Sequence, residues 1–380
     1  MSKVILSGNR QMSRFNHPRD SAHEIISSFP IPLKKIWRPL DALDARISSS
    51  IDYQLIHSFN RIPYTSKPWI VTFESLLPRI PKTRISKSAD SLLEKKLIER
   101  LALENCKRII AISKYAKNTF VRQNKNIDRK LLEVILDKVE VIHPNVAIEN
   151  RTPKKYKRGE TLNLVFVGNN FARKGGFVVL RLAAEANKRG LPIVFHLISA
   201  LNYSSHVHTD HVDKSKYEKD LKLLDLDNVV FHETIANKEV IQLLAKSHFQ
   251  IMPTLHDTYG FSIIEGFSGA TPAITTNVCA LPEIVHPGRN GYLLNLEVNQ
   301  QNCWDAVYRR DSQEYWDRLD STFNNLADRA LILLQELLDR PESYEQLSEG
   351  AIAQAEKMHS SEKTGKLLDD LYTKIANGVI

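Results

Sequence analysis

Two basic residues, Arg173 and Lys174, have the type and position expected of an anion-binding site. They lie in segment 167–176, which reads as a strand end, a turn and a helix start. Helix starts favour anions through their N–H groups and dipole, and both side chains would add charge-assisted hydrogen bonds to a phosphate. Gly168 allows the tight turn after the strand. A solvated Arg-Lys-Gly-Gly turn explains the same residues, so the pattern by itself decides nothing.

A second stretch, 253–276, carries two carboxylates eight positions apart, Asp257 in a predicted loop and Glu265 on the first turns of a predicted helix. Paired acceptor carboxylates can each bind sugar hydroxyls. The N–H groups at the helix start can bind an oxygen or a phosphate, and they belong to Gly260, Phe261 and Ser262. A structural explanation is also open, since Ser262 to Glu265 reads as a capping box and Asp257 can simply shape a turn.

The elements that must position these residues alternate between strand and helix, which predicts a parallel sheet covered on both faces. In the second half we expect strands at 162–168, 192–200, 228–235, 249–254 and 272–276, with helices at 177–190, 217–227, 238–247 and 261–270. In the first half we expect short parallel strands at 3–7, 53–59, 67–74, 107–113 and 138–146. Between residues 9 and 50 helices are placed only loosely, and the tail after 317 reads as mostly helical.

These elements predict an α/β protein with two doubly wound, Rossmann-like domains that face a central cleft, with ligands beyond the carboxyl ends of the strands. The polar stretch 149–161, with Pro and Gly, reads as the linker between them. We therefore expect a short, basic acceptor-side domain over 1–150 and a donor-binding domain over 151–355. A last helix over 356–380 is expected to return toward the first domain.

Charge and cysteine content narrow the class of protein. Residues 1–150 hold about 26 Lys and Arg against about 15 Asp and Glu, while the remainder is slightly acidic. A basic half can bind an anionic membrane surface or substrate, or can be ordinary solvated surface. No nucleic-acid-binding signature accompanies it. Three widely spaced cysteines indicate neither a disulfide framework nor a zinc motif, which favours the cytoplasm.

The succession of these motifs, followed by Pro282-Glu283 and a Gly-rich turn, resembles the family-four glycosyltransferases of GT-B architecture (glycosyl transferases group 1). The resemblance implies that Lys174 contacts the donor diphosphate and that Glu265 accepts from the ribose hydroxyls. It places Asp257, where the family has glutamate, near the donor sugar. It also places the stretch from Gly260 through Ile263 at the sugar hydroxyls and phosphates. The usual arginine after the glycine is Asn169 here, and the neighbouring Arg173 would supply its charge.

The first half departs further from that family. The histidine that the family often carries at the end of a strand is Glu74 here, so the resemblance implies a carboxylate at a functional position. Asn60 and Arg61 could line the acceptor side. His57 reads as a packed strand histidine, and the stretch 143–145 reads as a hinge at the crossing between domains.

The resemblance implies a glycosyltransferase of hexosyltransferase type. It would move a sugar from a nucleotide-diphosphate sugar to a glycan or lipid-linked acceptor in cell-envelope polysaccharide or lipopolysaccharide synthesis, with retention and without a metal or other cofactor. We expect it in the cytoplasm, held peripherally at the inner face of the membrane through anionic lipid. Lys174, Asp257 and Glu74 are the candidate catalytic residues. A sugar-nucleotide epimerase of the same architecture and a non-catalytic carbohydrate-binding relative remain open alternatives.

Overall fold

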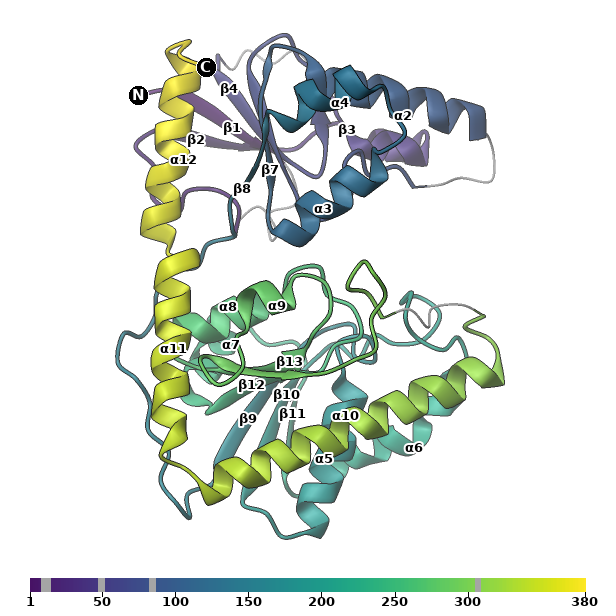
Figure 1. The fold of residues 1–380 in the computed structure, drawn as a ribbon, viewed down its shortest axis with the longest axis vertical. Coiled ribbons are helices and arrows are strands. Elements are labelled where there is room, and N and C mark those ends of the chain that lie inside the picture. Colours follow the sequence, from purple (N-terminus) through teal and green to yellow (C-terminus); the bar gives the residue numbers. More distant parts are fainter. Residues whose placement is uncertain (8–14, 47–51, 82–86, 305–308) are drawn as a thin grey trace. The chain divides into compact units, whose positions relative to one another are not determined.

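The computed structural model describes residues 1–7, 15–46, 52–81, 87–304 and 309–380. The chain divides into two units, residues 1–147 with 359–380 and residues 148–358 (Figure 1). Each unit contains a parallel six-stranded sheet, so the prediction of two doubly wound, Rossmann-like domains is confirmed. Within the described residues, no helix combines the length and the apolar character required to cross a bilayer.

The first unit has the strand order β2-β1-β4-β6-β7-β8. Its strands are β1 (Lys3–Ser7), β2 (Glu24–Ser28), β4 (Leu55–Phe59), β6 (Trp69–Phe73), β7 (Cys106–Ala111) and β8 (Val139–Val141), with the short pair β3 (Leu43–Asp44) and β5 (Ile62–Pro63) beside them. Its helices are α2 (Lys87–Ala102), α3 (Lys114–Gln123), α4 (Arg129–Leu136) and α12 (Ser361–Ala376), with 3-10 turns at Leu33–Lys35 and Arg38–Ala42. One face of the sheet is buried by α12, whose Leu368, Tyr372 and Ile375 pack against the central strands.

The second unit has the strand order β11-β10-β9-β12-β13-β14. Its strands are β9 (Leu162–Val167), β10 (Ile193–Ile198), β11 (Val229–His232), β12 (Phe249–Met252), β13 (Ala273–Thr276) and β14 (Gly291–Leu294). Its α-helices are α5 (Gly176–Lys188), α6 (Glu218–Leu221), α7 (Asn237–Lys246), α8 (Phe261–Ser268), α9 (Leu281–Ile284), α10 (Gln313–Asp339) and α11 (Ser343–Met358). Two 3-10 turns, Lys214–Tyr217 and Lys222–Asp225, flank α6.

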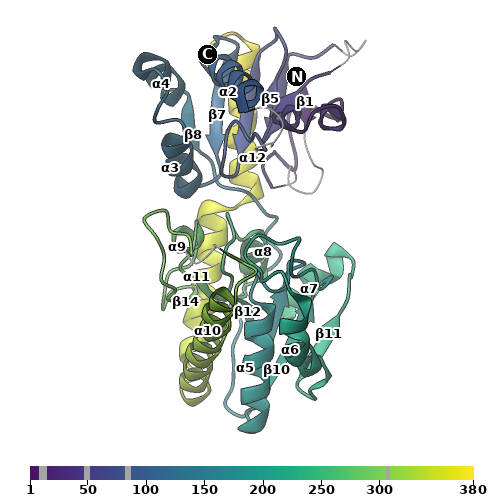
Figure 2. The ribbon, with the colours of Figure 1, turned by 90° about the vertical axis from the view of Figure 1, so that its right-hand side faces the viewer.

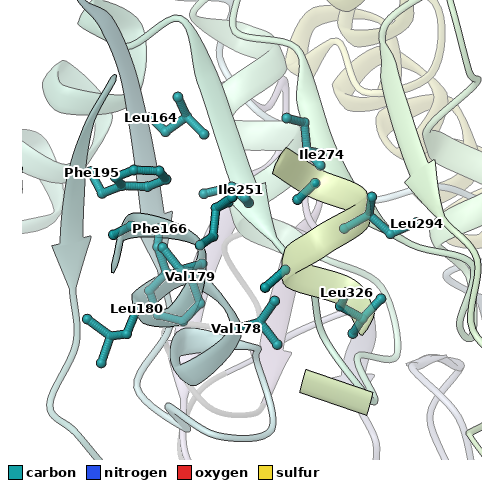
Figure 3. Packing of buried hydrophobic residues seen from close by; sticks show 14 of the residues in the cluster. Leu164, Phe166, Val178, Val179, Leu180, Phe195, Ile251, Ile274, Leu294 and Leu326 are labelled. Atoms are coloured by element: carbon teal, nitrogen blue, oxygen red, sulfur yellow. The ribbon is translucent and has the colours of Figure 1, made fainter. Parts of the chain in front are cut away.

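Alternation along β9 explains why helices cover both faces of this sheet. Leu164 and Phe166 point into the large core formed with α5 and α10 (Figure 3), two helices that pack against each other (Figure 2). Val165 between them points to the opposite face, where it meets Val240 and Leu244 of α7. Full burial of such a side chain contributes about 1.5–3 kcal/mol, so a strand that is apolar on both faces is stable only between two layers of helices.

The strand order reverses between β9 and β12, because the chain leaves β9 toward β10 and β11 and then returns to β12 on the other side. The loops that follow β9 and β12 therefore diverge at their carboxyl ends and leave space for a ligand. Arg173 and Lys174 follow β9, and Asp257 follows β12.

Two parts of the sequence interpretation were wrong. The described part of 9–50 contains the strand β2 and 3-10 turns in place of α-helices. The strand is at the sheet edge and has only partly buried side chains, so its sequence lacks a clear apolar period. The stretch 149–161 is no free linker, because Tyr156 is buried in the second unit's core and Lys154 Nζ donates to Ser247 O at 2.5 Å and to Thr271 Oγ1 at 2.6 Å.

Candidate active site

Lys174 and Asp257 meet at the switch point of the second unit. Lys174 Nζ lies 2.6 Å from Asp257 Oδ2, and both side chains are largely buried, with 19% and 9% of their surfaces exposed. The two residues are 83 positions apart in the sequence. They meet because β9 and β12 are neighbouring parallel strands, whose carboxyl ends lie at the same edge of the sheet.

The Asp257 carboxylate is held by the backbone as well as by Lys174. Its Oδ1 accepts from the N–H groups of Tyr259 at 3.2 Å and Gly260 at 2.7 Å. Burial alone would raise the pKa of this carboxyl, but the charges of Lys174 and Arg173 and these hydrogen bonds outweigh burial and hold the pKa below its usual range. Asp257 is therefore an anion that both shapes the turn and neutralises a lysine.

The loop after β9 brings Lys174 close to the sheet. A Cβ atom at Gly168 would lie 2.9 Å from Lys174 Cδ and 3.1 Å from Phe166 Cζ, so the lysine stem needs a glycine there. Arg173 Nη1 donates to His256 O at 2.9 Å, which places a second cation beside the loop that carries Asp257. Asn169, where the family pattern has arginine, accepts from Ala200 N at 3.2 Å through Oδ1. Arg173 and Lys174 thus form the basic side of the site.

The start of α8 differs from the predicted capping box. The helix is capped by Gly260, which has φ +86° and makes no side-chain cap. Ser262 is inside the helix and contacts Met252 Sδ at 3.7 Å through Oγ, so the capping-box explanation of Glu265 was wrong. Gly260 N donates to Asp257, and Ile263 N donates to Gly260 O at 2.9 Å. The role of Gly260 through Ile263 toward a donor stays a prediction, as does that of Glu265 toward a ribose.

Glu74, the third candidate catalytic residue, belongs to the first unit, where it directly follows β6 and is 9% exposed. Its backbone N–H donates to Asn60 Oδ1 at 3.0 Å, and Asn60 follows β4 with φ +58°. Arg61 Nη2 is paired with Asp41 Oδ1 at 2.7 Å. Glu74 and Asn60 therefore meet at the carboxyl ends of neighbouring strands, while the Arg61 guanidinium is held by Asp41.

His57 is confirmed as a packed strand histidine. Its ring nitrogens lie 2.7 Å from Tyr372 Oη and 2.7 Å from Thr72 Oγ1, and the side chain is buried. Burial, with a smaller effect of His17, lowers its pKa to about 3. Such a ring is neutral at physiological pH and has both nitrogens occupied, so it serves packing.

Residues 161–309 match the family model of the glycosyl transferases group 1. This match covers less than half of the chain. The matched segment includes the β9–Lys174 loop, the Asp257 loop and α8, so the candidate donor site lies inside it. A protein of Klebsiella pneumoniae described as an uncharacterized 41.2 kDa protein in the cps region is 24% identical over 169 residues, 42% of each chain. D-inositol 3-phosphate glycosyltransferase of Paenarthrobacter aurescens is 22% identical over 170 residues, 42% of this chain and 40% of that protein.

The chain thus matches less than half the length of these two curated relatives. Its fold is similar over its whole length to a solved GT-B structure, that of Anabaena HepE in complex with UDP and glucose. The TM-score is 0.59 and the identity 11%, over 98% of this chain and 100% of that one. At this identity the likeness shows the fold.

Two features of the chain were missed from the sequence. Asp225-Leu226-Asp227 is an Asp-x-Asp sequence, but both aspartates are exposed and lie before the amino end of β11, whereas the candidate site lies at the carboxyl ends of the strands. His256, Cys279 and Cys303 come together although their spacing matches no zinc motif. No local pattern could have found this cluster, because its members follow three different strands.

Proposed function

We propose that the chain is a glycosyltransferase that moves a sugar from a nucleotide-diphosphate sugar to a glycan or lipid-linked acceptor. The observation that carries the proposal is the Lys174–Asp257 pair at the switch point, inside the segment that matches the group 1 family. A uridine nucleotide is the first donor to test, since HepE, a structural neighbour, was solved with UDP and glucose.

In this proposal Lys174 and Arg173 bind the diphosphate and stabilise its charge as it leaves. The bond from the anomeric carbon to the diphosphate oxygen breaks with its electron pair on the diphosphate. The acceptor oxygen forms the new bond as its proton passes to an oxygen of the departing diphosphate. Lys174 has three N–H donors, so it can keep its contact with Asp257 and donate to a phosphate oxygen at the same time. Asp257 then accepts from a hydroxyl of the donor sugar, and Glu265 from the ribose.

Retention at the anomeric carbon and chemistry without a metal are the finer parts of the proposal. Chemistry without a metal is supported by the two cations at the β9 loop, which supply positive charge where other enzymes use a metal ion. Retention is what the resemblance to the family-four glycosyltransferases implies. A product analysis by NMR decides between retention and inversion. Turnover that needs no added divalent cation, such as Mg²⁺ or Mn²⁺, is expected for transfer without a metal in the reaction.

Calorimetry with UDP-glucose and related donors tests the binding roles. The double variant Arg173→Ala/Lys174→Ala is expected to lose donor binding, and Lys174→Ala alone to weaken it about 10- to 100-fold, since one charge-assisted hydrogen bond contributes about 1.5–3 kcal/mol. Lys188→Ala, which removes an exposed lysine at the end of α5, is the matched control and should bind as the wild type does. Unchanged affinity of the double variant would refute the diphosphate assignment.

The binding roles of Asp257 and Lys174 are distinguished by comparing the affinities for UDP and for UDP-sugar. If Asp257 binds the sugar, Asp257→Asn weakens UDP-sugar binding while UDP affinity stays the same or rises, because one negative charge beside the diphosphate is removed. An equal loss for both ligands would show that Asp257 only shapes the turn. NMR of the donor without acceptor tests the epimerase alternative, and donor binding without any turnover would indicate a non-catalytic carbohydrate-binding relative.

The proposal places the active protein in the cytoplasm, in peripheral contact with an anionic membrane that carries the acceptor. Supporting it, the first unit is basic, and its exposed apolar side chains include Phe29 at 57% and Ile36 at 82%, with Lys34 and Lys35 exposed beside Ile36. Co-sedimentation with anionic vesicles is expected to exceed that with neutral vesicles and to fall in Ile36→Asp. The control Val379→Asp, at another exposed apolar residue, should leave it unchanged.

A further inference from the structure

Three loops of the second unit bring two thiols and an imidazole together. His256 follows β12, Cys279 follows β13 and Cys303 follows β14, and these three strands are neighbours in the sheet. One side-chain ligand atom from each residue lies within 4.8 Å of the other two. The carboxyl ends of parallel strands lie at one edge, so three loops far apart in the sequence converge there.

The backbone holds the two cysteine loops in this arrangement. Cys279 N donates to Asn302 O at 2.6 Å, which ties the β13 loop to the residue directly before Cys303. Cys279 has φ +51° and Asn302 has φ +54°, a conformation uncommon for residues other than glycine. The backbone conformation of the two loops therefore positions the two thiols.

The imidazole of His256 supplies the observation that points to a ligand. Its Nδ1 is buried and makes no hydrogen bond within the described part of the chain. A buried polar atom without a hydrogen bond costs about 1–3 kcal/mol, so such atoms are rare unless they have another role. His208 packs edge-on against this ring, with centroids 4.8 Å apart, and restricts its orientation.

We propose that His256, Cys279 and Cys303 bind one Zn²⁺ ion, with the fourth position filled by water. Two thiolates and one imidazole form a donor set that suits this borderline-soft ion, which prefers four tetrahedral ligands. Both thiols lose their protons on binding, and two negative thiolates neutralise the divalent ion. Cys279 is buried and Cys303 is partly exposed, so the ion has an approach from the Cys303 side.

The ion would hold the loop that carries the donor-site residues. His256 directly precedes Asp257, and its carbonyl accepts from Arg173 Nη1 at 2.9 Å. Because the bound site has no net charge, it would act by positioning these residues and would add no attraction for a diphosphate. Metal binding therefore stands apart from the proposed transferase activity and can be measured without a donor.

Metal content of the purified full chain is the first test. After reconstitution with Zn²⁺ under reducing conditions and gel filtration, elemental analysis is expected to give one zinc per chain. Substitution with Co²⁺ should give the near-ultraviolet thiolate-to-cobalt absorption of a tetrahedral site. Cys279→Ala, Cys303→Ala and His256→Ala should each lower Zn²⁺ affinity about 100-fold or more, beyond the 10- to 100-fold typical of a residue that only supports a ligand.

Two variants control for residue type. Cys106→Ala removes the third thiol, which is buried in the first unit, and His206→Ala removes an exposed histidine; both should keep the zinc. If Cys279→Ala fails to fold, Cys303→Ser, at the partly exposed position, replaces it. In the wild type, Zn²⁺ at about 100 times its Kd should raise the free energy of unfolding by about 2.7 kcal/mol.

Three results would overturn the proposal. They are the absence of stoichiometric zinc in the reconstituted wild type, zinc that persists in all three ligand variants, and a Cys279–Cys303 disulfide in the purified protein that resists reduction and excludes the metal. Donor binding by calorimetry on the same samples is a separate measurement. A protein that binds donor but no zinc would refute this inference and leave the proposed function intact.

Discussion

Replacing Lys174 with methionine removes the cation that faces the buried Asp257 carboxylate and keeps a stem of similar length. Breaking a buried ion pair by removing one partner typically costs about 3–5 kcal/mol. Asp257 would keep its two backbone hydrogen bonds and the nearby charge of Arg173. We therefore expect the lower end of that range, about 3 kcal/mol, which corresponds to a fall of roughly 6–12 °C in Tm for a unit of this size.

Asp257→Asn leaves the Lys174 ammonium without its carboxylate partner. Because 19% of the Lys174 side chain is exposed, water can solvate this ammonium. We expect a loss of about 2 kcal/mol, nearer the cost of one charge-assisted hydrogen bond. The double variant Lys174→Met/Asp257→Asn has no unpaired charge and should lose about 3 kcal/mol in total. The sum of the single losses would then exceed the double loss by about 2 kcal/mol, within the range for residues in direct contact.

Urea unfolding followed by tryptophan fluorescence measures this cycle. Trp304 and Trp316 belong to the second unit, and the signal of Trp37 and Trp69 from the first unit is common to all four proteins. The pH dependence gives an independent check. The folded-state pKa of Asp257 is below its unfolded value, so its contribution is present above about pH 4 and is lost as the pH falls through the folded pKa. The difference in the free energy of unfolding between the wild type and Lys174→Met should therefore become smaller as the pH is lowered from 7 toward 3. A coupling energy within about 0.5 kcal/mol of zero, or a gap that does not depend on pH, would show that the pair contributes nothing to stability.

Further predictions concern close packing at two glycines, one in each unit, and a second buried carboxylate in the second unit. Gly168→Ala places a methyl group 2.9 Å from Lys174 Cδ, so it should cost about 1–3 kcal/mol and weaken donor binding in calorimetry. Gly365→Ala, whose nearest neighbour would lie 3.7 Å away, should be neutral or slightly stabilising in the same urea titration. Burial raises the pKa of Asp210 to about 7 against the opposing hydrogen bonds of Ser204 and Thr209, so its contribution to stability is complete below about pH 4 and is lost as the pH rises through 7. The free energy of unfolding of the wild type should fall between pH 5 and 8, and that of Asp210→Asn should not. Identical pH profiles for the two proteins would refute the raised pKa of Asp210.

The sequence by itself predicted the strands of the second unit, most of its helices and the location of its candidate site. The helix expected over 217–227 is instead the short α6 between two 3-10 turns. Apolar runs of four to six residues with a helix after each are a local pattern, and burial on both faces of β9 follows from it. The rule that ligands bind beyond the carboxyl ends of parallel strands then singled out the loops with Lys174 and Asp257. The edge strand β2 and the packed stretch 149–161 were misread, because their partly polar sequences acquire structure only from neighbouring elements.

Only the tertiary structure decided which side chains meet. Lys174 and Asp257 were predicted to contact different parts of a donor, and the sheet order places them in direct contact at 2.6 Å. His256, Cys279 and Cys303 lack any motif spacing, and three neighbouring strands bring them together. Hydrophobic periodicity is a local property of the sequence and can be recognised in it, whereas the convergence of loops depends on strand order. Strand order is set by packing over the whole sheet, so the chemistry at its edge becomes visible only when the sheet is formed.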